Sequence, residues 1–318
     1  MSCALLATVV AAAPAHAEPV ITDLGGLPGS TMNWVDAIND SGVAVGGSNS
    51  GGRINRAVRF DGGGASELVG PAGASTDLVA VNNNGVAAGI TTVDGNKAIR
   101  FAADGTYQVL SVPFGYVNAV ARAIDDSGTV FGLVGDHVTG GQIPVRWRPN
   151  GVITSMKMPA GATWAYVTTA SPNGYVAGYV NGSGADFTAV RWNPDGSVTT
   201  LPRLVANGTT TAQAVNRNGD VVGTAFDGER SFGVRWHTDG SITKLAAGVE
   251  PKDINDHGVT VGWAHHEGRQ LPFRWNDDGE KTELGLPEGT DTVYRLAINN
   301  DGVIVGSAGN AAYKWTVN

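Results

Sequence analysis

Cysteine is almost absent from this chain, which excludes a fold held together by disulfides. The 318 residues contain one cysteine, Cys3, and it lies close to the N-terminus. Small secreted domains that cannot build a large core depend on several disulfides. A chain of this length can bury a large core without them. We therefore expect packing, rather than covalent cross-links, to stabilise the fold.

Two other features are missing. No run of lysine and arginine stands out, and the formal net charge is -8. Because proteins that grip nucleic-acid phosphates concentrate basic residues on one face, we expect no nucleic-acid partner. Beyond the first residues, no apolar stretch approaches the roughly 18 residues of a transmembrane helix. The sequence therefore predicts no membrane insertion.

The N-terminal segment has the composition of a signal peptide. Residues 4–13 are apolar and rich in alanine, and Ala15-His16-Ala17 fits a small-X-small cleavage site. No lysine or arginine precedes the apolar run, which leaves open a start further upstream or an N-terminus that is not a signal. We expect residues 1–17 to be removed and residues 18–318 to form one secreted domain.

Glycine is abundant, with 46 residues, and it marks a repeat. Each copy reads approximately apolar, Ala, Ile or Val, Asn, two variable residues and Gly, followed by a short apolar stretch. Gly42 and Gly302 lie six copies apart, so the mean period is about 43 residues. The seven turn glycines are Gly42, Gly85, Gly128, Gly174, Gly219, Gly258 and Gly302.

A basic residue followed by an aromatic one marks a later part of each copy. The pair is usually Arg-Trp or Arg-Phe, and we expect the aromatic ring to pack between neighbouring units. A period of this size, with four short strands in each unit, is typical of a β-propeller. The aromatic residues are Phe60, Phe101, Trp147, Trp192, Trp236, Trp275 and Trp315.

The first copy reads as a four-stranded meander over residues 34–39, 43–47, 56–60 and 66–69, with a tight turn at Gly42. The last copy stops in its third strand. Its missing strand is at the other end of the chain, because residues 21–29 match residues 281–289. We predict an all-β, seven-bladed β-propeller with four-stranded antiparallel blades. The N-terminal strand would complete the last blade and close the ring.

These motifs carry a family resemblance. Residues 24–29 read Leu-Gly-Gly-Leu-Pro-Gly, and residues 37–46 read Ala-Ile-Asn-Asp-Ser-Gly-Val-Ala-Val-Gly. The pattern resembles the bacterial secreted HAF-type extracellular repeat family over nearly the whole mature chain. The name-giving His-Ala-Phe triplet is replaced here, for example by Arg56-Ala57-Val58. Since that family is defined by its repeat rather than by a chemistry, the resemblance implies no catalytic residue.

Polar residues that break the repeat are candidates for catalysis. The sixth copy holds His265, His266 and Glu267 in what reads as a loop, and the third copy holds Asp136 and His137 in the matching loop. A histidine beside a carboxylate suits general acid–base chemistry at a channel mouth. The alternative is a solvated polar loop. Neighbouring strand residues point to opposite sides, so we identify no metal ligands, although a divalent metal is compatible with the loop.

Aromatic and charged residues in the longer loops are candidates for ligand binding. Most other copies carry small residues at the aromatic positions, and exposed rings suit stacking on sugars or flat ligands. The alternative is that these rings pack on neighbouring loops. The predicted ligand-binding residues are Trp34, Tyr116, Trp164, Tyr294, Arg295, Arg269 and Glu229.

A variable position on the innermost strand of each copy is expected to line the axial channel. Three classes of function remain open, because the fold alone does not choose between them. The first is a secreted binding module for a glycan or another extracellular small molecule. The second is a secreted lyase or hydrolase that uses the histidines as proton-transfer groups. The third is a purely structural protein of the cell surface or matrix. We identify no cofactor and expect a monomer. The variable channel residues are Asp36, Val79, Arg122, Thr168, Gln213, Lys252 and Leu296.

Overall fold

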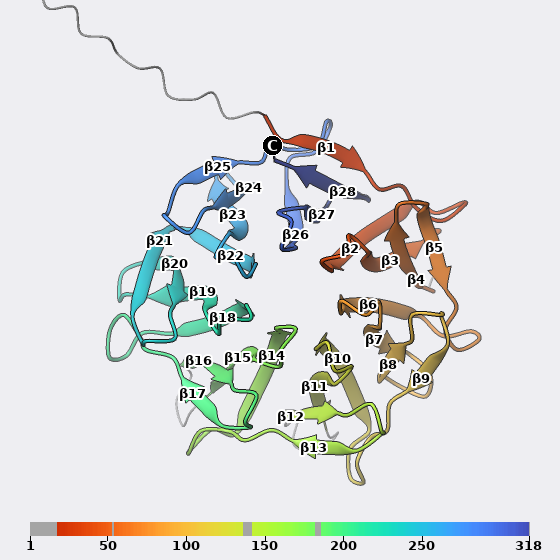
Figure 1. Cartoon of the computed structure of the whole chain (residues 1–318), viewed down its shortest axis with the longest axis horizontal. Coiled ribbons are helices and arrows are strands. Elements are labelled where there is room, and N and C mark those ends of the chain that lie inside the picture. The colour runs from red at the N-terminus through yellow and green to blue at the C-terminus, as the bar shows by residue number, and fades with distance from the viewer. Residues whose placement is uncertain (1–17, 53, 136–141, 182–185, 318) are drawn as a thin grey trace, which may run out of the picture.

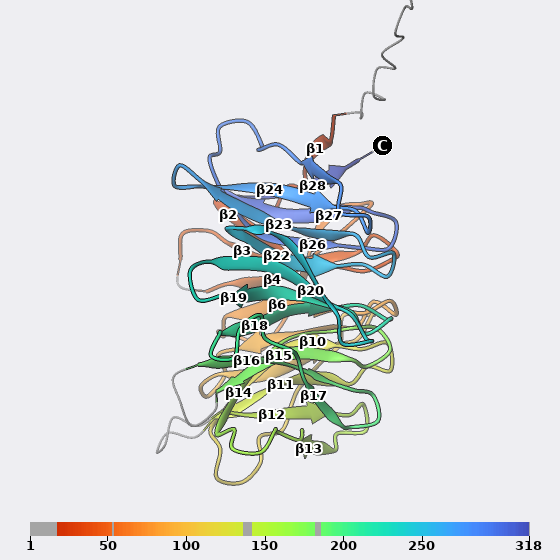
Figure 2. The same ribbon diagram turned by 90° about the vertical axis from the view of Figure 1, so that its left-hand side faces the viewer.

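Seven four-stranded antiparallel sheets stand around a central axis (Figure 1), as the repeat predicts. The computed structural model describes residues 18–52, 54–135, 142–181 and 186–317. Figure 2 shows the sheets from the side, at right angles to the view along the axis. The predicted signal peptide, Asp136 and His137 lie outside the described residues. In the described ranges, no helix is long and apolar enough to cross a membrane.

Six sheets place their strands in sequence order from the axis outward, and in the seventh the order is β26, β27, β28 and then β1. The innermost strands are β2 (Met32–Ile38), β6 (Thr76–Val81), β10 (Asn118–Ile124), β14 (Trp164–Ala170), β18 (Thr210–Val215), β22 (Val249–Ile254) and β26 (Val293–Ile298). The second strands are β3 (Ala44–Asn49), β7 (Ala87–Thr91), β11 (Val130–Gly135), β15 (Val176–Asn181), β19 (Val221–Phe226), β23 (Thr260–His266) and β27 (Ile304–Ala308).

The third strand of each blade is buried at its aromatic residue, and most outermost strands are short and more exposed. The third strands are β4 (Arg56–Asp61), β8 (Lys97–Phe101), β12 (Gln142–Trp147), β16 (Phe187–Trp192), β20 (Ser231–Trp236), β24 (Arg269–Trp275) and β28 (Ala311–Thr316). The outermost strands are β5 (Gly64–Leu68), β9 (Tyr107–Val109), β13 (Ile153–Ser155), β17 (Val198–Thr200), β21 (Ile242–Ala247), β25 (Lys281–Glu283) and β1 (Val20–Asp23).

The last blade combines both ends of the chain. β1 pairs antiparallel with β28, with Val20 opposite Thr316 and Asp23 opposite Tyr313. The hydroxyl of Ser307, in this blade, accepts a hydrogen bond from the backbone N–H of Val35 in the first blade at 3.0 Å. Contacts between the first and last blades thus add to the pairing of β1 with β28.

Most innermost strands carry a β-bulge opposite a glycine of the second strand. In the first blade the register shifts between Val35 and Ala37, so Asp36 is the extra residue. A Cβ on Gly46 would lie 2.0 Å from the carbonyl oxygen of Trp34, which only glycine avoids. The bulge sets the residue that faces the axis. The equivalent glycines are Gly89, Gly132, Gly178, Gly223, Gly262 and Gly306.

The asparagine of the repeat joins the blades as well as forming the turn. The Asn39 side-chain oxygen accepts a hydrogen bond from the backbone N–H of Val43 at 2.9 Å, and its amide donates to the carbonyl of Asn82 in the next blade at 2.9 Å. An ionised aspartate has no proton to donate, and the Ser171 hydroxyl at this position of the fourth blade donates to Asn173 within its own turn instead. The same bond to the next blade recurs from Asn82, Asn216, Asn255 and Asn299.

The arginine and tryptophan of the third strand also contact the neighbouring blade. The Arg59 guanidinium donates to the carbonyl of Gly85 in the next blade at 2.8 Å. The buried Trp147 ring donates through Nε1 to the carbonyl of Ser111, in the connection from the preceding blade, at 2.8 Å. The repeat residues are therefore framework residues, and function must be sought in positions that differ between the copies.

Candidate functional site

A cavity of about 370 Å³ lies on the axis between the innermost strands. Its volume is near the lower end for small-molecule sites. The bulges and the alternation of the inner strands place the variable residues in its wall, as the sequence predicts. These residues are Asp36, Val79, Arg122, Thr168, Gln213, Lys252 and Leu296.

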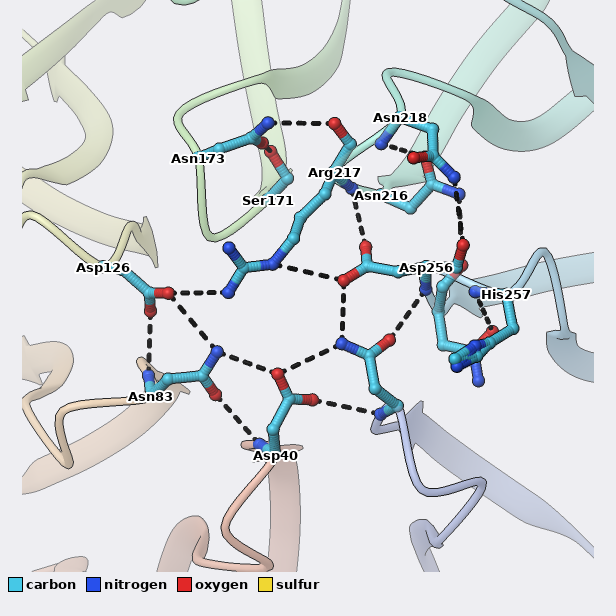
Figure 3. A network of polar contacts seen from close by, with 12 residues as sticks. Asp40, Asn83, Asp126, Ser171, Asn173, Asn216, Arg217, Asn218, Asp256 and His257 are labelled. Carbon is cyan, nitrogen blue, oxygen red and sulfur yellow. Dashed lines mark hydrogen bonds and ion pairs between the residues drawn. The ribbon is translucent and has the colours of Figure 1, made fainter.

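A ring of polar side chains from the tight turns surrounds one end of the cavity (Figure 3). Asn83 donates through its amide to Asp40 at 2.8 Å and to Asp126 at 3.3 Å. Asn300 donates in the same way to Asp40 at 3.1 Å and to Asp256 at 2.7 Å. We call these residues, with Arg217, the polar ring. It satisfies three carboxylates at this end of the cavity.

The fourth blade contributes no polar side chain to the ring, and Arg217 extends past it. The equivalent residue of the fourth blade is Pro172, which has no polar side chain, although its backbone carbonyl accepts a hydrogen bond from the N–H of Asp126 at 2.9 Å. Arg217, from the fifth blade, reaches Asp126 of the third blade at 2.8 Å and also pairs with Asp256 at 3.2 Å (Figure 3). Every carboxylate of the polar ring thus alternates with a donor.

Two aspartates of the cavity that lie outside the polar ring, Asp36 and Asp253, have bonding partners within the protein. Asp36 forms an ion pair with Arg295 of the last blade. Burial raises the pKa of Asp36 to about 6, despite the opposing effect of Arg295. Asp253 accepts hydrogen bonds from the backbone N–H groups of Ile254 and Ile298, both at 2.9 Å. Burial raises the pKa of Asp253 to about 7 in spite of these bonds.

The cation Arg122 has a different environment. Its guanidinium lies over the ring of Tyr166, 4.8 Å from the ring centroid, and both residues line the cavity. In the described part of the chain, no hydrogen bond or ion pair reaches this guanidinium, and its buried Nε has no partner. Arg122 is close enough to Asp36 to favour the charged carboxylate without bonding to it.

An aromatic cluster extends from Tyr166 to the face with the longer loops. Tyr166 stacks on Tyr179 with ring centroids 5.2 Å apart, and Trp164 stacks on Tyr166 at 6.0 Å. Phe187 completes the cluster, 5.3 Å from Tyr179 and 6.0 Å from Trp164. Tyr166 lines the cavity, and Phe187 is exposed. The fourth blade thus presents a continuous aromatic surface from the axis to the loops.

A polar chain in the sixth blade connects the predicted histidine with the cavity. His265 Nε2 lies 3.0 Å from Glu250, and Glu250 pairs with Lys252 at 2.9 Å. Burial alone would raise the pKa of Glu250, but the hydrogen bonds from His265 and Lys252 outweigh burial and lower it. Lys252 also lies 4.1 Å from the ring centroid of Trp263. Lys252 lines the cavity, so the chain runs from the axis outward.

The other predicted catalytic residues are not brought together. His265 and His266 belong to strand β23 rather than to a loop, and only Glu267 and Gly268 turn the chain back into β24. His266 and Glu267 are exposed and 4.0 Å apart. Among the described residues, no three His, Cys, Asp or Glu side chains lie close enough together to hold a metal ion.

The predicted ligand-binding residues have separate surroundings. Tyr116 packs against the core between the second and third blades. The Tyr294 hydroxyl donates to the carbonyl of Gly309, and the Trp34 ring lies where a Cβ on Gly47 would be. Arg269 donates to the carbonyl of Asp291 at 3.3 Å. Of the predicted aromatic residues, Trp164 belongs to the cluster next to the cavity.

Two more of the predicted residues lie apart from the cluster. Arg295 lies on β26 and holds Asp36. Glu229 is exposed in the turn between β19 and β20, where its backbone N–H donates to Asp227 at 3.1 Å. Sequence reasoning missed Tyr166, Tyr179 and Phe187. The signal for Tyr179 was available, because the corresponding positions of other copies hold Gly47, Ile90 and Thr224.

Comparisons with known proteins identify the fold of this chain. No protein-family model and no curated protein matches the sequence. A streptogramin B lyase structure is similar, with a TM-score of 0.66 and 14% identity over 94% of this chain and 98% of that one. An oligogalacturonate lyase in complex with manganese gives 0.69 and 13% over 94% and 93%. A catalytically inactive virginiamycin B lyase from Staphylococcus aureus with quinupristin gives 0.64 and 13% over 95% and 100%. At these identities the likeness shows that the chain shares the propeller fold.

Proposed function

We propose that this protein is a secreted binding module that takes a small extracellular ligand, with carbohydrate as the leading class, into the axial cavity. The aromatic cluster carries the proposal. Trp164, Tyr166, Tyr179 and Phe187 form one surface that begins in the cavity wall and ends at the loop face. Aromatic faces of this kind stack on sugar rings and on flat organic molecules.

The two ends of the cavity favour entry from the loop face. The polar ring lies at the end with the tight turns, where Asn83 and Asn300 each hold two of its carboxylates. At the other end, the partly exposed rings of Trp164 and Phe187 are available for contact. A ligand entering there would meet the aromatic surface first and the charged cavity residues next.

Substitution of Trp164 tests the proposal. Residues 18–318 and the variant Trp164→Ala are screened against an oligosaccharide array, and hits are followed by isothermal titration calorimetry. We expect a loss of about 5-fold or more in affinity, because stacking on an aromatic residue contributes on the order of 1 kcal/mol. Phe114→Ala is the matched control, since Phe114 is fully exposed and lies outside the cluster. Equal affinities for the two variants would contradict the proposal.

A second candidate function is a lyase or hydrolase reaction at the mouth of the cavity. The chain from His265 through Glu250 to Lys252 favours it, because it couples a titratable imidazole to a cavity-lining ammonium group. A polysaccharide substrate assay that follows new reducing ends and unsaturated products tests it. Loss of turnover in His265→Ala, with retention in His266→Ala, would support catalysis. Equal turnover in the two variants would speak against this chain of residues.

Secretion and the HAF-type repeat family remain part of the proposal. Mass spectrometry of the protein recovered from the medium of an expressing bacterium identifies its N-terminus. Cleavage after Ala17 is the expected result. Retention of the protein in the cytoplasm with residues 1–17 intact would remove the secreted part of the proposal and leave the ligand site open to test.

A further inference from the structure

Most acids of the axial cavity are matched by donors within the protein. The polar ring satisfies Asp40, Asp126 and Asp256 with two amides and the guanidinium of Arg217. Farther from this ring, Asp253 accepts two backbone N–H groups, and Asp36 is paired with Arg295 through one oxygen while its buried Oδ2 has no hydrogen-bond partner. The negative charge of the cavity wall is therefore largely compensated within the protein.

The two cations of the cavity wall differ. Lys252 is paired with Glu250 at 2.9 Å and covered by Trp263. Arg122 has no bonded carboxylate or carbonyl among the described residues. It lies over the face of Tyr166 and near the carboxylate of Asp36, to which it does not bond. A cation–π contact supplies roughly 0.5–2 kcal/mol, which is less than a partly buried guanidinium loses by leaving water.

Neutral polar groups neighbour Arg122 on the next inner strands. Thr168 and Gln213 line the same cavity, and the buried Thr168 hydroxyl has no hydrogen-bond partner. A guanidinium offers a planar fork of N–H donors that matches the two oxygens of a carboxylate. A hydroxyl and an amide in the same cavity wall can supply further hydrogen bonds to such an anion.

We propose that the axial cavity selects a carboxylate carried on a ring, with the carboxylate on Arg122 and the ring against the aromatic cluster. The inference rests on the proposed function and adds the ligand class to it. Tyr166 joins the two halves of the site, because one face carries the Arg122 guanidinium and its ring stacks with Tyr179 and Trp164. Acidic sugars and aromatic acids share this chemistry.

The experiment uses two matched pairs of probes and the chain of residues 18–318. Glucuronic acid is compared with glucose, and benzoate is compared with benzyl alcohol, by ligand-observed NMR titration. We expect at least one acid to bind 10-fold or more tightly than its neutral partner. The pair with the larger ratio distinguishes a pyranose from an aromatic body, and either result supports the inference.

Substitution of Arg122 tests its role. Arg122→Gln should abolish the preference for the acid and leave the affinity for the neutral partner unchanged, whereas Arg122→Lys should keep part of the preference. Arg148→Gln is the control, since Arg148 is exposed and lies outside the axial cavity. If Arg122→Gln fails to fold, loss of part of the preference in Arg122→Lys, with retention in the control, supports the inference.

Other results would overturn it. An acid preference that survives in Arg122→Gln, or equal affinity for acid and neutral probes in the wild-type protein, contradicts the role of Arg122 but leaves the binding module intact. Failure of both acids to bind also overturns the inference. The proposed function is then decided by the Trp164→Ala comparison, which does not depend on the charge of the ligand.

Discussion

Replacing Arg217 with methionine should open the polar ring while keeping the aliphatic part of the side chain. Arg217 contributes ion pairs with Asp126 at 2.8 Å and Asp256 at 3.2 Å. The side chains are partly exposed, at 38% for Arg217 and 27% and 21% for the two aspartates. Because solvent screens such pairs, each contributes roughly 0.2–1 kcal/mol.

The loss should nevertheless exceed that of one surface ion pair. Without Arg217, Asp126 keeps only its bonds to Asn83, and the carboxylates around the axis lose their only cation in the ring. We expect the free energy of unfolding to fall by about 1–2 kcal/mol. With an entropy of unfolding of about 2.1 cal/mol/K per residue, that corresponds in a chain of this size to a decrease in melting temperature of about 1.5–3 °C.

Thermal and urea unfolding at two salt concentrations measure the effect. In 1 M NaCl the difference between wild type and Arg217→Met should shrink, since the Debye length falls to about 3 Å. Arg148→Met is the control, because the exposed Arg148 has no ion pair among the described residues. If both variants melt alike at low salt, the polar ring is not an electrostatic unit and our reasoning about it is wrong.

Three other perturbations test the fold and the cavity. Gly132→Ala should cost about 3 kcal/mol, because its Cβ would meet the Val120 carbonyl at 2.0 Å, whereas Gly196→Ala, strained only by its positive φ, should cost about 1 kcal/mol; urea denaturation compares them. Asp36 and Asp253 should titrate near pH 6 and 7 by carboxyl ¹³C NMR, against 3.8 for an unperturbed aspartate, and values below 4.5 would contradict the structure. Because the native state holds these protons more tightly than the unfolded chain, their contribution to stability is complete below about pH 4 and is lost as the pH rises through 6 and 7. Removing residues 18–23 should lower the melting temperature by leaving β28 without its outer partner, and an unchanged value would show that β1 does not stabilise the ring.

The architecture could be predicted from the sequence because the same pattern of turns and strands recurs in each repeat. Gly42 and its equivalents have positive φ in the turns, and Trp147 packs between blades as its position predicts. The variable inner-strand residues line the axial cavity, also as predicted. Local turn chemistry and a repeated pattern are sufficient for these features, since neither depends on how distant side chains meet.

The pairing of individual side chains was less accessible. Arg122 and Tyr166 lie in different blades, and their contact depends on the bulge that points Arg122 toward the axis. His265 was expected in a loop, but a two-residue turn extends β23 to His266. The partner of Arg217 is 91 residues away, on the far side of a blade that contributes only Pro172 to the ring. Such contacts follow from the geometry of the closed ring, which a single repeat does not contain.

The number of blades constrains the polar ring through simple parity. Acceptors and donors can alternate around a closed circle only when its members are even in number, and this protein has seven blades. In the fourth blade, Pro172 contributes no polar side chain to the ring. The long side chain of Arg217 extends past this blade to Asp126. The six members that remain alternate without a mismatch. In a propeller with six or eight blades, every blade could contribute one donor or one acceptor to such a ring. The proline at position 172 and the arginine at position 217 are therefore a solution specific to seven blades.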